Sequence, residues 1–319
     1  MLQFFDLTLQ NRGQQGWILY TQKERVRNRH YIDLYRNACE RYGLSLKLGI
    51  YDPVRVWDEA ARLRLAAVAG SSRRPDFVIN RTRDYMLAAE LEKRGITVYN
   101  HSSIAELGND KAKACRFMEQ SGIAVMPTVY GVQNPPWYPA VIKSADGHGG
   151  TEVYWISDRQ QMEHWKRTAR QPRKEYLIQQ AASDLGRDVR VYLIGDEIAA
   201  SVLRSCDHDF RSNFCLGGTV SLYELSEKER GMVNQIVSKI VSKITTKLVT
   251  KPEGACGAKR QSLIGMAGID FIFHHGQMVF NEIEDMAGAR SLYSLSDYDI
   301  VDAYVEWIWK RNKLEGDQG

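Results

Sequence analysis

Cysteine is scarce in this chain of 319 residues, and its five cysteines show no C-x-x-C spacing. An odd number without that spacing argues against a disulfide framework and a structural zinc site, and free thiols fit a reducing cytosol. No stretch approaches the about 18 consecutive apolar residues of a membrane span. The N-terminus has no basic region followed by an apolar core, as a signal peptide would. We therefore expect a cytoplasmic protein without a membrane partner.

The chain also lacks a strong charge of either sign. Lys and Arg total 43 against 39 Asp and Glu, a net charge of +4. A dedicated nucleic-acid-binding protein usually shows a clustered basic face, whereas Arg25, Arg27 and Arg29 are more typical of a solvated loop or helix start, so no nucleic-acid partner is expected. A hydrophobic content of 44% excludes intrinsic disorder. At roughly 100–200 residues per domain, the length predicts about two domains.

Short β-type runs alternate with amphipathic stretches through the first hundred residues. Apolar residues near helical spacing, such as Ile32, Tyr35 and Cys39, predict a helix that Gly43 ends. Strands are expected at 16–20, 44–51, 75–79 and 96–99, and helices at 30–42, 54–65 and 84–93. This βαβα order predicts a parallel sheet covered by helices.

Beyond residue 100 the pattern contains more β-runs. Helices are expected at 110–121, 158–170, 227–250 and 297–310, and strands at 124–132, 140–143, 153–156, 176–180, 188–194, 197–204, 267–273 and 278–283. The last helix carries an apolar stripe. We expect it to pack on its own domain, with a contact between copies of a homo-oligomer as the alternative.

Three carboxylates belong to the two final strands. Asp270 lies in the run GIDFIF, and Glu282 and Glu284 lie two apart in FNEIED, so that the two glutamates share one face. Carboxylates from neighbouring strands suit Mg²⁺, which prefers a few carboxylates together with waters and substrate phosphates. A solvent-facing acidic edge is the alternative.

A lysine and a glycine-rich turn follow one another after an apolar strand. The strand VIK ends in Lys143 and leads to the turn DGHGG, which spans residues 146–150. Glycine lets backbone N–H groups approach phosphate oxygens, and lysine adds a point charge. The segment is neither a Walker loop nor a Rossmann fingerprint. It therefore predicts a phosphate-binding loop, with an ordinary hairpin turn as the alternative.

Two arginines, Arg190 and Arg204, lie inside apolar β-runs. A partly buried arginine generally needs an anionic partner. A third arginine, Arg211, lies in the segment DFRSN shortly afterwards. These arginines are candidates for anion recognition. The alternative is that they are surface residues without a binding role.

Taken in order, these segments resemble the ATP-grasp superfamily, specifically its RimK-like branch of carboxylate–amine ligases. The similarity runs from Asn80 to about Leu292 and includes NDKAKACRFMEQSGIAVMPT, VIKSADGHGG, LIQQ, GRDVRVYLIGDEIAA, DFRSNFCLGG, GIDFIF and NEIED. The resemblance rests on the order of all these segments, because each segment alone is weak evidence. It implies the ATP-grasp fold, of the α/β class, with an N-terminal βαβα domain (1–100), a small lobe (101–182) and a large lobe (183–319).

The resemblance also implies roles for individual residues. In such enzymes the lysine of the N-D-K helix start and the strand lysine hold the nucleotide phosphates, the glycine-rich turn is a mobile lid, and the hinge strand lines adenine. The matching positions are Lys111 and Lys143 for phosphates; Gly147, His148, Gly149 and Gly150 for the lid; Gln179, Gln180, Ala181 and Ala182 for adenine; Asp188 and Ser212 near the nucleotide; Arg190, Arg204, Arg211 and Asn213 for catalysis; and Asp270, Glu282 and Glu284 for metal.

The sequence departs from the family pattern at a few positions. Gln180 replaces the usual glutamate of the hinge, although an amide carbonyl can still accept a hydrogen bond. Glu284 replaces the usual asparagine, and residues 285–290, next to the acceptor pocket in the family, read DMAGAR. The loop 251–262 is longer than is common. These departures indicate a subfamily with its own substrate.

The activity that the resemblance implies is an ATP-dependent ligase with two Mg²⁺ ions. It joins a small-molecule carboxylate to an amine, an amino acid or peptide, through an acyl phosphate. Two alternatives remain: an ATP-grasp kinase with a hydroxyl acceptor, and a non-catalytic relative of the spore-associated kind. His148 is either a general base or a polar residue of the loop.

Overall fold

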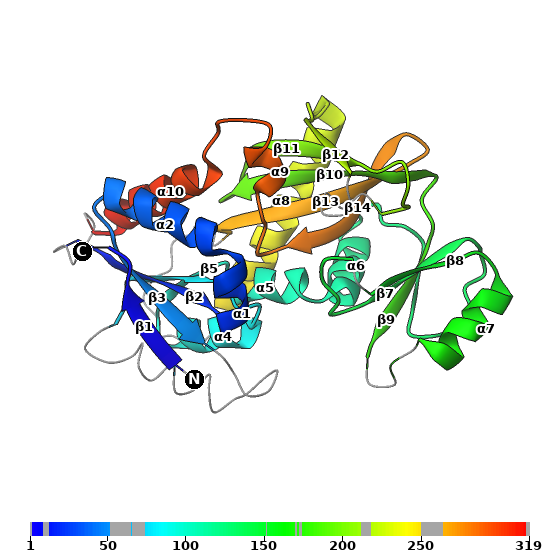
Figure 1. The fold of residues 1–319 in the computed structure, drawn as a ribbon, viewed down its shortest axis with the longest axis horizontal. Coiled ribbons are helices and arrows are strands. Elements are labelled where there is room, and N and C mark those ends of the chain that lie inside the picture. The colour runs from blue at the N-terminus through cyan, green and yellow to red at the C-terminus, as the bar shows by residue number, and fades with distance from the viewer. Residues whose placement is uncertain are drawn as a thin grey trace.

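The computed structural model describes residues 2–8, 13–51, 65, 74–150, 152–169, 171, 174–211, 218–249 and 264–316. These residues form three β-sheets, each covered by helices (Figure 1). Within the described part of the chain, no helix combines the length and the apolar character needed to cross a membrane.

The first sheet belongs to the N-terminal unit. Its strands are β1 (Leu2–Asp6), β2 (Gln15–Tyr20), β3 (Ser45–Tyr51), β4 (Phe77–Asn80) and β5 (Thr97–Tyr99), in the order β1-β3-β2-β4-β5. Strands β2 to β5 are parallel, as predicted, while β1 adds an antiparallel edge that was not predicted. Its helices are α1 (Gln22–Arg27), α2 (Arg29–Arg41) and α4 (Tyr85–Lys93). The helix predicted at 54–65 falls outside the described residues, except for Leu65.

The second sheet forms a small lobe at the other end of the molecule (Figure 1). It contains β6 (Thr128–Tyr130), β7 (Ala140–Ser144), β8 (Val153–Ile156) and β9 (Tyr176–Gln180), in the order β6-β9-β7-β8. Helix α7 (Arg159–Thr168) lies within the helix predicted at 158–170; Asp158 caps it, and Met162 and Trp165 are buried against the sheet. Helices α5 (Ser102–Gly108) and α6 (Lys111–Gln120) lead into this lobe.

The third sheet is antiparallel and lies between the other two. Its strands are β10 (Asp184–Ile194), β11 (Glu197–Ser205), β12 (Thr219–Leu222), β13 (Met266–His274) and β14 (Gln277–Glu284), in the order β12-β11-β10-β13-β14. Successive side chains of each strand point to opposite faces of this sheet. Val189, Val191 and Leu193 pack in the core under helix α8 (Glu227–Val249). Asp188 and Arg190, which alternate with the first two of these residues, face the other way and line a cavity.

The C-terminal segment returns to the N-terminal unit. After the short helix α9 (Arg290–Tyr293), helix α10 (Ile300–Gly316) lies beside α2 (Figure 1). Its apolar stripe is buried in one core with α2 and β3, and the rings of Tyr35 and Tyr304 are 6.3 Å apart. The helix was predicted to pack on its own domain; it contacts β10 of that domain, but its main partner is α2 of the N-terminal unit.

Candidate functional site

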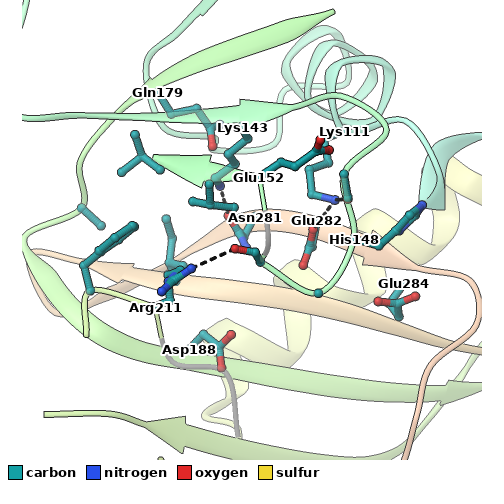
Figure 2. A pocket seen from close by; sticks show the side chains of 18 of the residues that line it. Lys111, Lys143, His148, Glu152, Gln179, Asp188, Arg211, Asn281, Glu282 and Glu284 are labelled. Carbon is teal, nitrogen blue, oxygen red and sulfur yellow. Dashed lines mark hydrogen bonds and ion pairs between the residues drawn. The ribbon is translucent and has the colours of Figure 1, made fainter. Parts of the chain in front are cut away.

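A cavity lies between the small lobe and the third sheet, and most of the predicted site residues line it (Figure 2). The predicted residues in its wall are Lys111, Lys143, Gly147, His148, Gly149, Gly150, Gln179, Gln180, Ala182, Asp188, Arg190, Arg211, Glu282 and Glu284. Ala181, Arg204 and Asp270 are not in the wall. Ser212 and Asn213 lie outside the described residues.

The register of the third sheet brings the charged side chains together. Arg190 of β10 is paired with Asp270 of β13, which is paired with Glu282 of β14, and Asp188 is paired with Arg204 of β11. Residues directly opposite each other in a sheet project to the same face. The sequence motifs, distant along the chain, therefore meet on one face of this sheet.

Beneath the cavity these side chains form a buried ion network. Arg190 donates to both oxygens of Asp270 at 2.7 Å, and Arg204 donates to Oδ2 of Asp270 at 2.7 Å while also binding both oxygens of Asp188. Burial acts to raise the pKa of Asp270, but the two arginines outweigh it and hold this pKa well below its usual range. Arg204, predicted to be catalytic, thus lies under the cavity and supports its floor through two aspartates.

Lys111 lies where three elements converge. Asp110 caps α6 by accepting from the backbone N–H of Lys113 at 2.9 Å, and the N–H of Lys111 donates to the carbonyl of Ala145 at 2.8 Å. This fixes Lys111 beside the glycine-rich turn, and its Nζ lies 3.0 Å from Oε2 of Glu282. Although burial acts to lower the pKa of Lys111, Glu282 and its neighbouring carboxylates raise it. Lys111 is therefore a fixed positive charge.

The side chain of Lys143 is held by the side-chain amide of Asn281, whereas Lys111 is held by a carboxylate. Its Nζ donates to Oδ1 of Asn281 at 2.6 Å (Figure 2). Burial, with Lys111 adding to it, lowers the pKa of Lys143 to about 8, against the opposing effect of Glu282. Lys143 is therefore mostly charged near pH 7 and loses this charge as the pH rises above about 8.

Asn281 was missed by the sequence analysis because strand alternation places it on the face opposite to Glu282. The pairing of β13 with β14 shifts between Asp270 and Phe271: Asp270 pairs with Glu282, while Phe271 pairs with Phe280. Asn281 is the extra residue of a β-bulge. The bulge lets two successive residues, Asn281 and Glu282, both reach the cavity.

The glycine-rich turn covers the charged end of the cavity. Gly149 and Gly150 have φ of 66° and 74°, which side chains other than glycine rarely adopt. The guanidinium of Arg211, held by Asp209, donates to the carbonyl of Gly150 at 2.9 Å. Burial, together with Arg83 and Lys111, lowers the pKa of His148 to about 4. His148 is accordingly neutral near pH 7.

Part of the cavity wall is apolar. It includes the side chains of Val141, Val153, Leu185, Phe210 and Ile272, which the sequence analysis did not single out. In the adjacent hinge, the backbone N–H groups of residues 180 and 181 donate to the carbonyls of residues 127 and 139. The cavity therefore offers a ligand both cationic and apolar groups.

The three predicted metal carboxylates are each oriented toward a cation. Asp270 is bound by two arginines, Glu282 by Lys111, and Glu284 has Arg190 at 3.9 Å. Across the described ranges, His, Cys, Asp and Glu side chains form no cluster of three or more that could hold a metal ion.

The small lobe and the third sheet, with the cavity between them, have the arrangement of the ATP-grasp fold. Residues 108–247 match the family described as the RimK-like ATP-grasp domain. The ribosomal protein bS6–L-glutamate ligase of Escherichia fergusonii is 24% identical over 232 residues, which cover 69% of this chain and 69% of that protein.

Solved structures agree on the fold. D-cycloserine synthetase superposes with a TM-score of 0.67 at 13% identity, covering 93% of this chain and 99% of the other. D-alanine–D-alanine ligase from Bacillus anthracis, solved with ATP, gives a TM-score of 0.61 at 12% identity, covering 94% and 99%. The match of residues 108–247 to the RimK-like ATP-grasp domain agrees with the resemblance that the sequence predicted.

Proposed function

We propose that this protein is an ATP-dependent carboxylate–amine ligase that forms an amide bond through an acyl phosphate and releases ADP and phosphate. The single observation that carries the proposal is the combination of cationic and apolar side chains in one cavity. Two lysines from separate elements, Lys111 and Lys143, meet the oxygens of β14, and apolar side chains line the same cavity. A nucleoside triphosphate has anionic phosphates and a largely apolar base, and the similar ligase of Bacillus anthracis was solved with ATP.

In the first step the γ-phosphoryl group moves from ATP to a carboxylate oxygen of the substrate. The bond to ADP breaks and an acyl phosphate forms, so that positioning and neutralisation of charge are the main needs. Lys111 and Lys143 neutralise the phosphates, and residues 147–150 cover them. Gln179, Gln180, Ala181 and Ala182 border adenine. Closure over the site excludes water, which would hydrolyse the acyl phosphate.

In the second step the amine attacks the acyl carbon, the C–O bond to phosphate breaks, and the amine gives up a proton. Arg190 and Arg211 face this region and stabilise the developing oxyanion, a contribution that is typically worth about 10²–10³ in rate per donor. Arg204 and Asp188 act indirectly by holding the floor in place. Ser212 and Asn213 keep the roles beside the transferred phosphate that the family resemblance implies.

The carboxylates of the third sheet fit Mg²⁺ by their chemistry. Glu282 and Glu284 share one face of β14 and both line the cavity, whereas Asp270 lies beneath the wall and is bound by Arg190 and Arg204. We assign two Mg²⁺ ions to the two glutamates and the ATP phosphates. The ions would neutralise charge on the β- and γ-phosphate oxygens.

Product analysis tests the proposal. Purified protein is incubated with ATP, Mg²⁺ and pools of carboxylates and amines, and ADP, AMP and new masses are followed. We expect ADP release that requires both a carboxylate and an amine, with an amide as product. Formation of AMP, or of ADP without either substrate, contradicts the proposal. A phosphorylated hydroxyl compound as the product points to a kinase instead.

A further inference from the structure

The glycine-rich turn joins β7 to β8, and each of its two sides carries a carboxylate. Asp146 opens the turn, and Glu152 follows it, directly before β8. The two sides are joined at their base: the backbone N–H of Ser144 donates to the carbonyl of Glu152 at 3.2 Å, and its hydroxyl donates to Oδ1 of Asp146 at 2.5 Å. The position of the turn over the cavity therefore depends on how these two acidic residues are held.

Lys174 binds both carboxylates. It lies shortly before β9, the strand beside β7, where Ser144 is paired with Tyr176. Its Nζ donates to Oε1 of Glu152 and lies 3.7 Å from Oδ1 of Asp146. The hydrogen bond to Glu152 raises the pKa of Lys174, so this lysine is charged near pH 7. One cation thus ties the two sides of the turn together.

Glu152 brings a negative charge to the wall that is proposed to face phosphate. It lines the cavity together with Lys111 and Lys143 (Figure 2). Its carboxylate lies against the turn, because a Cβ atom at position 147 would be only 3.2 Å from its Oε2. Lys174 is not in the wall and binds this carboxylate from outside the cavity. It therefore neutralises a charge that would otherwise repel the phosphates.

The turn is also bound to the cations of the cavity through its carbonyl groups. Nζ of Lys111 donates to the carbonyl of Gly147, and the guanidinium of Arg211 donates to the carbonyl of Gly150 at 2.9 Å. Both side chains have a role in the proposed reaction. A displacement of the turn would therefore change the surroundings of two cations that act on the phosphates and on the oxyanion.

We propose that Lys174 is a positioning residue for the proposed ATP-dependent reaction. It neutralises Glu152 and ties it to Asp146, so that the glycine-rich turn admits the phosphates of the nucleotide and then covers them. Lys174 touches neither nucleotide nor substrate and acts through the two carboxylates. The inference rests on the proposed function, and neither Lys174 nor Glu152 belongs to the segments that carry the family resemblance.

Calorimetry of the full chain with Mg²⁺ and a non-hydrolysable ATP analogue tests the neutralisation of Glu152. Lys174→Met leaves this carboxylate unpaired, so nucleotide affinity should fall at least about tenfold, because like charges placed against each other are costly. Lys174→Arg keeps the charge and should stay within about threefold of the wild type. Lys166→Met is the matched control, since Lys166 forms an ion pair with Glu163 in the same lobe, outside the cavity wall. Unchanged affinity in Lys174→Met overturns the proposal.

Rescue by a second substitution separates neutralisation from folding. Glu152→Gln removes the negative charge and keeps the shape, so nucleotide affinity should be kept or raised, and this variant needs no change at Lys174. In Lys174→Met/Glu152→Gln the affinity should return to within about threefold of the wild type, because the two sites are coupled. A merely structural lysine would leave the double variant as weak as Lys174→Met, and that result overturns the proposal. A loss of affinity in Glu152→Gln overturns it too, since the carboxylate would then bind the nucleotide or its metal directly.

The number of ADP molecules released per amide measures how well the turn covers the site. At saturating nucleotide, Lys174→Met and the double variant should both release more ADP per amide than the wild type, because a turn that is no longer tied admits water to the acyl phosphate. The double variant should thus recover nucleotide affinity without recovering this ratio. A wild-type ratio in both variants overturns the positioning role.

The outcomes also distinguish this inference from the ligase activity itself. The affinity measurements need no reaction. If they give the expected pattern but no amide forms with any carboxylate and amine, the ligase is wrong and Lys174 still positions the turn for nucleotide. If the wild type forms an amide and Lys174→Met binds nucleotide as tightly as the wild type, the role of Lys174 is wrong and the ligase stands.

Discussion

Nucleotide affinity should depend on pH through Lys143. The pKa of this lysine is lowered to about 8 by burial. About 90% of the molecules then carry the charge at pH 7 and about 10% at pH 9, as follows from the definition of a pKa. Because phosphates bind the charged form, affinity for the nucleotide should fall about tenfold over this range, and binding at pH 9 should take up a proton.

Calorimetric titration with a non-hydrolysable ATP analogue and Mg²⁺ at pH 7, 8 and 9, in buffers of different ionisation enthalpy, measures both effects. Lys143→Arg is the control, because arginine stays charged throughout, and its affinity should be flat with pH. Lys111, whose pKa is raised, does not titrate in this window. An affinity of the wild type that is constant from pH 7 to 9 refutes the reasoning, as does an equal fall in Lys143→Arg.

Lys143 also makes the free energy of unfolding depend on pH, and this free energy should rise with pH where nucleotide affinity falls. An unfolded lysine titrates near 10.4, so between pH 8 and 10 the unfolded chain binds more protons than the folded one. The contribution of Lys143 to the free energy of unfolding therefore rises with pH across this window. Chemical denaturation without nucleotide should show a rise for the wild type that is absent in Lys143→Met.

Three further predictions follow from the cavity and its floor. Asp270→Asn should lower the free energy of unfolding by about 3–5 kcal/mol in a urea titration, because Arg190 and Arg204 lose their buried carboxylate; a loss under about 1 kcal/mol would contradict the network. His148→Gln should leave the pH profile of ADP release unchanged between pH 6 and 8, since a pKa of about 4 keeps the imidazole neutral there. If the wild-type rate changes with pH in this range and the variant rate does not, His148 acts as a general base. Chelation of Mg²⁺ should abolish ADP release and restored Mg²⁺ should recover it; full activity in excess chelator would rule out the metal.

Much of the fold follows from local patterns. The helix that starts at Asp110, the turn glycines and the strand predicted at 140–143 are found where the sequence predicted them, because each depends on neighbours within a few residues. The elements that were missed, β1, α1, α5, β12 and α9, are at most seven residues long. Segments of that length show too few repeats of either period to be recognised.

The sequence predicted which motifs belong to the site, but not how their side chains are arranged in space. Which arginine faces the cavity depends on strand register: Arg190 reaches it, while Arg204 is held beneath by Asp188. Asn281 depends on a bulge that alternation cannot show. Arg81 interacts electrostatically with residues of β2, α2 and the segment after β14, and only the tertiary structure brings these segments together.

The packing of α10 against α2 has a consequence for how the chain folds. The core of the N-terminal unit includes Tyr35 and Ile50 and is completed by Ile300, Tyr304 and Ile308. On the ribosome, where domains generally fold as units from the N-terminal end, this first unit must wait for nearly the whole polypeptide. A chain truncated before residue 300 would expose the apolar face of α2, so both ends of the sequence must be present before either is stable.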